Sequence, residues 1–152
     1  MIEFENSILI QAPVKEVYSF LADLENLSKW NYYVLVVRRI EGAQATVGTI
    51  YHQVRKTDEE NLRIEELIPD RKIVVNTVQP SPLMLEMTLR LAEEGAATRL
   101  RDGWKLDTGR PALLERLGQG TVKAAAAQNL EKLKELLETG RVVLQDGRVA
   151  LK

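Results

Sequence analysis

The sequence predicts an α+β domain in which a seven-stranded antiparallel sheet wraps around a long C-terminal helix. Three observations support this fold class. An amphipathic helical pattern directly follows the first strand-like segment, six more strand-like segments are separated by short polar turns, and one long helical pattern ends the domain. Short turns join neighbouring antiparallel strands, and a sheet with one apolar face must cover that face.

The first part of the chain predicts one strand followed by two short helices. Residues 2–11 alternate in part between apolar and polar side chains, as a strand does. Pro13 suits the first turn of a helix, and an apolar face then continues at helical spacing as far as Leu21. Asp23 is placed to cap a second short helix that ends near Trp30.

The middle of the chain predicts six further strands, at residues 33–41, 49–56, 62–68, 72–78, 83–92 and 97–107. The segment 83–92 alternates with period two, so one of its faces is expected to be buried and the other wet. The helical pattern then covers residues 111–138. Gly140 is placed to end this helix, because glycine readily adopts the left-handed conformation there.

Composition indicates one domain and excludes several kinds of protein. The chain has 152 residues, a net charge of −1 and no cysteine, so disulfides and thiolate sites are excluded. The near-zero charge gives no reason to expect nucleic acid as a partner. No basic leader precedes an apolar run, and no run approaches the roughly 20 residues of a membrane span. A cytoplasmic domain over residues 1–139, without integral membrane association, is therefore predicted.

Several of these features resemble the START-like (SRPBCC) superfamily, the polyketide cyclase/dehydrase-like helix-grip proteins. The resemblance covers residues 2–138 and rests on Ala12-Pro13 and the helix after it, residues 23–27, Trp30, Gly48-Thr49, Pro69 and residues 129–134. It implies an elongated apolar cavity between the sheet and the C-terminal helix. Proteins of this kind bind lipids, isoprenoids, sterols, polyketides or other hydrophobic molecules; some cyclise or dehydrate the ligand, and many only carry or sense it.

Strand pairing predicts which polar groups would reach such a cavity. If the turn at residues 57–60 is regular, opposed residues share a face, and His52 lies opposite Glu66 on the apolar side. Asn76 and Asp102 fall on the apolar parity of their own strands. The alternative is a bulge that shifts the register and turns some of these groups to solvent, or a structural polar pair at the cavity mouth.

The favoured function is binding or carrying a small hydrophobic ligand, with no cofactor and no metal. The predicted ligand-binding residues are Trp30, Tyr33, His52, Val54, Ile64, Glu66, Asn76, Met87, Leu89, Asp102, Trp104, Leu114 and Leu117. Two alternatives stay open. One is a cyclase or dehydratase in which His52 works with Glu66 or Asp102 as general acid or base. The other is a ligand-free module that binds a protein partner.

The tail at residues 140–152 is unexpected for the superfamily. Asp146-Gly147 favours a two-residue turn, which predicts a β-hairpin that pairs Leu144 with Val149. An isolated hairpin is marginally stable in water, so it should pack on the outer face or edge of the sheet or on a second subunit, and a homodimer contact is predicted. The alternative is a frayed tail.

Overall fold

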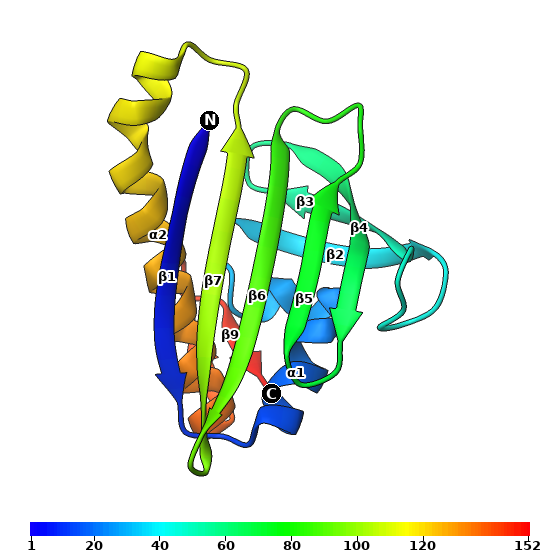
Figure 1. Cartoon of the computed structure of the whole chain (residues 1–152), viewed down its shortest axis with the longest axis vertical. Helices are drawn as coiled ribbons and strands as arrows, with labels where there is room; N and C mark the ends of the chain where they lie inside the picture. Colours follow the sequence, from blue (N-terminus) through cyan, green and yellow to red (C-terminus); the bar gives the residue numbers. More distant parts are fainter.

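The computed structural model describes residues 1–152, and its elements follow the predicted order (Figure 1). The main sheet contains β1 (Ile2–Ile10), β2 (Val34–Glu41), β3 (Ile50–Arg55), β4 (Glu59–Ile68), β5 (Lys72–Thr77), β6 (Met84–Glu94) and β7 (Ala97–Asp107). The helices are α1 (Val14–Ala22), the 3-10 helix η1 (Leu24–Lys29) and α2 (Ala112–Thr139). The tail forms β8 (Arg141–Val143) and β9 (Val149–Leu151).

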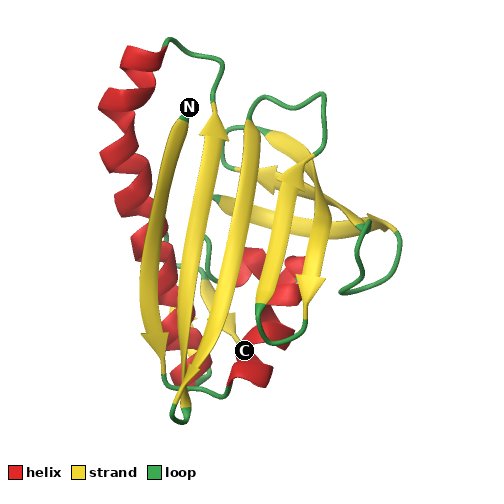
Figure 2. Ribbon diagram, in the orientation of Figure 1, coloured by secondary structure: helices red, strands yellow, loops and turns green.

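The seven strands form one antiparallel sheet in the order β1-β7-β6-β5-β4-β3-β2. Figure 1 shows β2 and β3 crossing behind the other strands, so the sheet is strongly curved. The helices and the C-terminal hairpin lie on the same side of it, its inner face (Figure 2). The predicted helix-grip architecture, with two short helices between the first two strands, is confirmed.

The core fills the space between this inner face and the helices. Its main cluster contains 24 buried residues, and it joins α1 and η1 to the sheet and to the C-terminal half of α2. Leu130 and Leu133 of α2 are 1% and 0% exposed. A smaller cluster joins Ala126 to Phe4 and Leu106 near the middle of the helix. The second half of α2 therefore anchors the helix.

The beginning of α2 projects beyond the core. Leu114 and Leu117, both predicted as cavity walls, are 53% and 73% exposed, and Leu113 is also exposed. The helix has 28 residues, a length of about 42 Å, whereas the nine residues of the adjacent β1 reach only about 30 Å. The helix outruns the strand beside it, and the prediction for these two leucines is wrong.

The tail folds back on its own chain. Gly140 ends α2 with φ 85°, and Val142, Leu144 and Ala150 then pack on Leu136. The predicted pairing is wrong by one residue, because the observed pairs are Val142–Ala150 and Val143–Val149. The amide of Leu144 donates to the carbonyl of Arg148, which encloses a three-residue loop whose last residue, Gly147, has φ 90°. Val143, Val149 and Leu151 face away and are exposed, and the homodimer contact stays a prediction.

Candidate functional site

A pocket of about 280 Å³ opens between the inner face of the sheet and the middle of α2. Its apolar lining consists of Leu83, Leu85, Trp104, Leu106, Val122, Ala125 and Ala126, and its polar groups come from Tyr33, Arg55, Thr121 and Asn129. The helix leaves room here because its apolar side chains at the pocket are only two alanines and a valine, all of them small. The volume is close to the lower end of the roughly 300–1,000 Å³ typical of small-molecule sites.

A smaller hollow of about 50 Å³ continues the pocket towards β2. The two spaces adjoin, because they share Tyr33, Arg55, Leu85 and Trp104 in their walls, and we refer to them together as the branched cavity. The inner branch adds Leu27, Asn31, Val34, Gln53, Leu62, Val75 and Met87. The cavity is therefore apolar along β5–β7 and polar at the end of β3.

Arg55 is the charged group of this cavity. Its side chain is 22% exposed, and its guanidinium makes no hydrogen bond with the protein. The nearest carboxylate oxygens lie 3.8 Å away on Asp58 and 3.9 Å away on Glu60. Arginine has five N–H donors in a planar fork, so this group has donors to spare for a ligand's oxygen.

Glu60 lies behind the polar end of the cavity and binds Gln53, one of its lining residues. Its buried side chain accepts hydrogen bonds from Gln53 Nε2 at 3.1 Å and from Ser81 Oγ at 2.9 Å. Burial raises the pKa of Glu60, while the bond from Ser81 and the charge of Arg55 oppose that rise. These contacts hold Gln53 and the Arg55 region in a defined orientation.

Asp102 lies on the inner face of β7, as its parity indicated, and it is 2% exposed. The indole Nε1 of Trp104 donates to both carboxylate oxygens of Asp102 at 3.0 Å. Burial raises the pKa of Asp102 to about 7, although the indole bond acts in the opposite direction. Trp104 also stacks on Phe4, with ring centroids 5.5 Å apart. Asp102 thus orients a wall of the cavity and does not line it.

His52 lies on the outer face of the sheet, so its predicted place in the cavity is wrong. It pairs with Asn61, whose Oδ1 is 2.8 Å from His52 Nδ1, and its side chain is 37% exposed. The turn between β3 and β4 is much tighter than expected, and Val54 lies opposite Glu59 instead of Ile64. The observed partner of Val54 is five residues away from the predicted one. Because this shift is an odd number, the side chains of β3 that were expected to face inwards, Val54 among them, face outwards.

Glu66 and Asn76 also lie on the outer face, against prediction. The register of β4 shifts between Ile64 and Glu66, which marks a bulge and turns Glu66 towards Lys72, 3.1 Å away. Asn76 lies between Arg63 and Glu86. Strand β5 has three consecutive apolar residues, Ile73, Val74 and Val75, and all three are buried. Its sequence therefore does not show which face points inwards.

The other predicted wall residues divide into two groups. Tyr33, Met87 and Trp104 line the branched cavity. Trp30, Ile64 and Leu89 are 3%, 0% and 1% exposed, and they belong to the packed core. Sequence reasoning missed Gln53 and Arg55. Gln53 and Arg55 lie on the same face of β3 as the buried Tyr51, and this shared parity was the available signal. A prediction with a tight turn directly after Arg55 would have placed all three side chains on the inner face.

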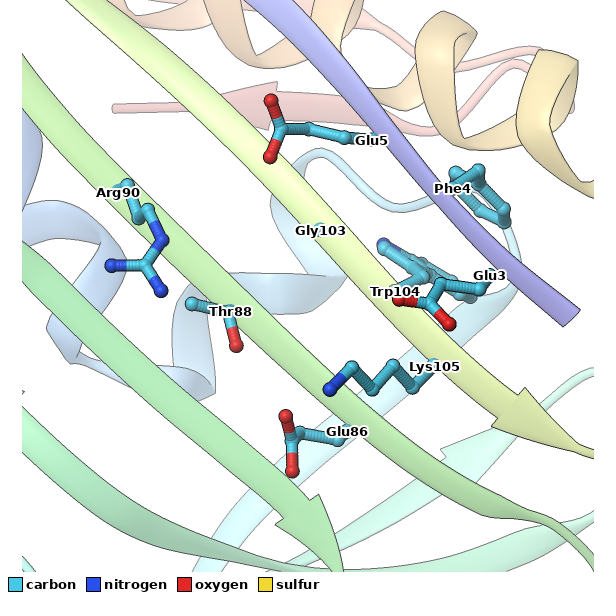
Figure 3. Close-up of a pocket in the computed structure, with 9 residues that line it drawn as sticks. All are labelled: Glu3, Phe4, Glu5, Glu86, Thr88, Arg90, Gly103, Trp104 and Lys105. Carbon is cyan, nitrogen blue, oxygen red and sulfur yellow. The ribbon is translucent and has the colours of Figure 1, made fainter. Parts of the chain in front are cut away.

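A second hollow, of about 400 Å³, lies on the outer face above Gly103 (Figure 3). Gly103 stands between Glu5 and Thr88 in the sheet, and the absence of its side chain leaves the gap. The surrounding side chains are largely charged, with Glu86 and Lys105 beside it. An apolar ligand gains little burial on such a surface, and we assign the candidate site to the inner cavity.

Two further features concern metal ions and membranes. No three histidine, aspartate or glutamate side chains come close enough together to hold a metal ion. None of the helices carries an apolar stretch that could cross a bilayer.

Solved structures share this fold at low sequence identity. A START superfamily protein from Mycobacterium smegmatis matches with a TM-score of 0.74 and 13% identity, over 90% of this chain and 99% of that one. The Aha1 dimer from Colwellia psychrerythraea matches with a TM-score of 0.68 and 19% identity, over 92% and 98% of the two chains. The di-domain ARO/CYC BexL from the BE-7585A biosynthetic pathway matches with a TM-score of 0.67 and 19% identity, over 90% of this chain and 47% of BexL.

The comparison with curated proteins finds no match. The family model described as "Polyketide cyclase / dehydrase and lipid transport" matches residues 1–138, which include all seven strands of the main sheet and nearly all of α2. The match stops before the C-terminal hairpin. The chain therefore belongs to the polyketide cyclase/dehydrase and lipid transport family.

Proposed function

We propose that the protein binds or carries a small hydrophobic ligand in the cavity between the sheet and α2. The observation that carries the proposal is the apolar pocket of about 280 Å³ beside Ala125 and Trp104. Membership of a family described by cyclase, dehydrase and lipid transport functions supports a ligand of this kind. Burying about 200 Å² of apolar ligand surface would contribute roughly 5 kcal/mol to binding.

The polar end of the cavity orients this ligand. Arg55 offers unused N–H donors beside an otherwise apolar wall, and Tyr33 and Asn129 line the same pocket. An amphiphile with an oxygen acceptor at one end would place that oxygen at Arg55 and its apolar body against α2. Polyketide-like molecules and lipid acids both have this form, and the ARO/CYC description of BexL supports the former.

The geometry gives less support to catalysis than to ligand binding. His52, the one histidine of the chain, lies on the outer face and cannot reach the cavity. Asp102 is directed to the Trp104 indole and is buried behind it. A cyclase or dehydratase that uses His52 with either carboxylate is therefore not proposed.

The first experiment tests occupancy of the cavity. Ala125 lines the pocket and its neighbour Ala124 is exposed, so Ala125→Phe should fill the space while Ala124→Phe serves as the matched control. Binding of decanoate, followed by calorimetry, should fall at least tenfold in the first variant and stay unchanged in the second. Equal affinities in both variants would place the ligand elsewhere. Native mass spectrometry of the purified protein would add the mass of any bound ligand.

The second experiment tests the orientation. Arg55→Gln should remove the preference of the cavity for decanoate over decanol, because hydrogen bonds to a charged group contribute about 1.5–3 kcal/mol. Arg63→Gln, on the outer face, is the control and should keep that preference. If Arg55→Gln still prefers the acid, the carboxylate does not bind at Arg55.

A further inference from the structure

The turn of the C-terminal hairpin reaches across to the segment that leads into β2. Arg148 Nη1 donates to the carbonyl of Val34 at 2.8 Å, and Nη2 donates to the carbonyl of Tyr32 at 2.7 Å. Arg148 Nε donates to Asp146 Oδ2 at 2.8 Å, which keeps the guanidinium in place. One side chain of the tail therefore binds two backbone carbonyls of a distant segment.

A second ion pair ties the same turn to the end of β3. Lys56 Nζ lies 2.9 Å from Asp146 Oδ2 and 4.5 Å from the centre of the Tyr32 ring. The backbone amide of Lys56 donates to the carbonyl of Tyr33 at 3.0 Å. The Lys56 ammonium, and then the Arg148 backbone and charge, lower the pKa of Asp146 to about 2. The turn, the end of β3 and residues 32–34 form one charged network.

The segment held in this way is a wall of the cavity. Tyr33 lines both branches of the cavity, and Val34 lines the inner one. On its other side, the amide of Tyr32 donates to Asn129 Oδ1 of α2 at 3.1 Å. Opening the cavity between β2 and α2 therefore requires this segment to move, and Arg148 opposes the movement.

The base of the hairpin keeps the turn in position. Val142 and Leu144 are buried against Leu136 of α2, at 1% and 3% exposure. The hairpin is thus anchored on the helix that forms one side of the cavity, while its turn holds the strand segment on the other side. The family match ends at residue 138, so the hairpin lies outside the matched segment.

We propose that the Asp146–Arg148 turn is a latch that holds residues 32–34 against α2 and slows the entry and release of the ligand. This regulation rests on the proposed binding function. Arg148 is a positioning residue, because it acts through the backbone of the cavity wall and does not itself line the cavity. Releasing it should speed ligand exchange more than it changes affinity, because both association and dissociation pass through the same opening.

The test compares Arg148→Ala with Arg141→Ala, a control in the same hairpin whose exposed side chain makes no hydrogen bond or ion pair. Hydrogen exchange of ligand-free protein should quicken about tenfold at the amides of residues 32–36 in Arg148→Ala only. The amides of β1 and β7 should keep their protection, which separates local release from unfolding. Stopped-flow tryptophan fluorescence should show faster dissociation of decanoate from the same variant.

The outcomes distinguish the latch from the function on which it rests. If decanoate binds and leaves Arg148→Ala at the rate seen for unaltered protein, or if residues 32–36 stay protected, the latch is overturned while binding stands. If the unaltered protein binds neither decanoate nor decanol, the proposed function fails, and the role in ligand exchange fails with it. Faster exchange and faster dissociation, absent in Arg141→Ala, support the latch.

Discussion

Replacing Asp102 by asparagine tests the buried carboxyl group on the inner face of β7. Asparagine has nearly the same shape and keeps an oxygen that can accept the bond from Trp104 Nε1, which lies 3.0 Å from both oxygens of Asp102. It cannot ionise. The variant therefore removes the cost of a buried charge while the packing around the indole is kept.

The magnitude follows from the pKa. Burial raises the pKa of Asp102 from 3.8 to about 7 in the folded state. Because the folded protein binds this proton more tightly than the unfolded chain, the free energy of unfolding falls as pH rises from about 4 to 7, and it levels off above 7. At 1.36 kcal/mol per pKa unit the full effect is about 4 kcal/mol, and relaxation around the charge lowers the expectation to about 2–4 kcal/mol.

The assay is urea unfolding at pH 5 and pH 8, followed by tryptophan fluorescence. Asp102→Asn should be more stable than the unaltered protein at pH 8, and the difference should shrink at pH 5. Glu3→Gln, on an exposed carboxyl of β1, is the control and should change stability by less than about 0.5 kcal/mol at either pH. A stability difference that is the same at both pH values would refute the reasoning, because a pH-independent effect cannot come from ionisation.

Three further substitutions test the description of α2. Leu133→Ala should lower the free energy of unfolding by about 2–5 kcal/mol in urea titrations, because Leu133 is 0% exposed in the main core. Gly140→Ala should cost about 1–2 kcal/mol in the same titrations, since Gly140 has φ 85°. Leu117→Ala should change stability by less than about 0.5 kcal/mol and leave decanoate affinity unchanged in calorimetry; a loss of affinity would show that the start of the helix closes over the ligand.

Local patterns were reliable where one face of an element is plainly apolar. The alternation of Leu100, Trp104 and Leu106 along β7 correctly indicated that Asp102 faces inwards. Strand β3 has apolar side chains on both parities, with Tyr51 on one and Val54 on the other, so its sequence does not choose a face. The error at His52 follows from this ambiguity, because only the turn length decided which set points inwards.

The contacts that define the candidate site come from distant parts of the chain. Arg55 at the end of β3 shares the pocket with Asn129 of α2, and Arg148 of the tail holds the segment around Tyr33. No spacing in the sequence brings these residues together. The turn residues Asp146-Gly147 located the hairpin correctly. Its loop has three residues instead of two, so the strand register differs by one residue from the prediction.

The sequence by itself determined the order of strands and helices, because side-chain period and turn residues are local properties. That order, with an apolar face that had to be covered, predicted one antiparallel sheet wrapped around the long helix. The tertiary structure alone decided which face of β3 and of the end of β4 points inwards and how far α2 extends beyond β1. It also decided that the tail binds the segment that leads into β2. The physical reason is that hydrogen bonding between strands sets register, and one turn or one bulge of odd length reverses every side chain beyond it.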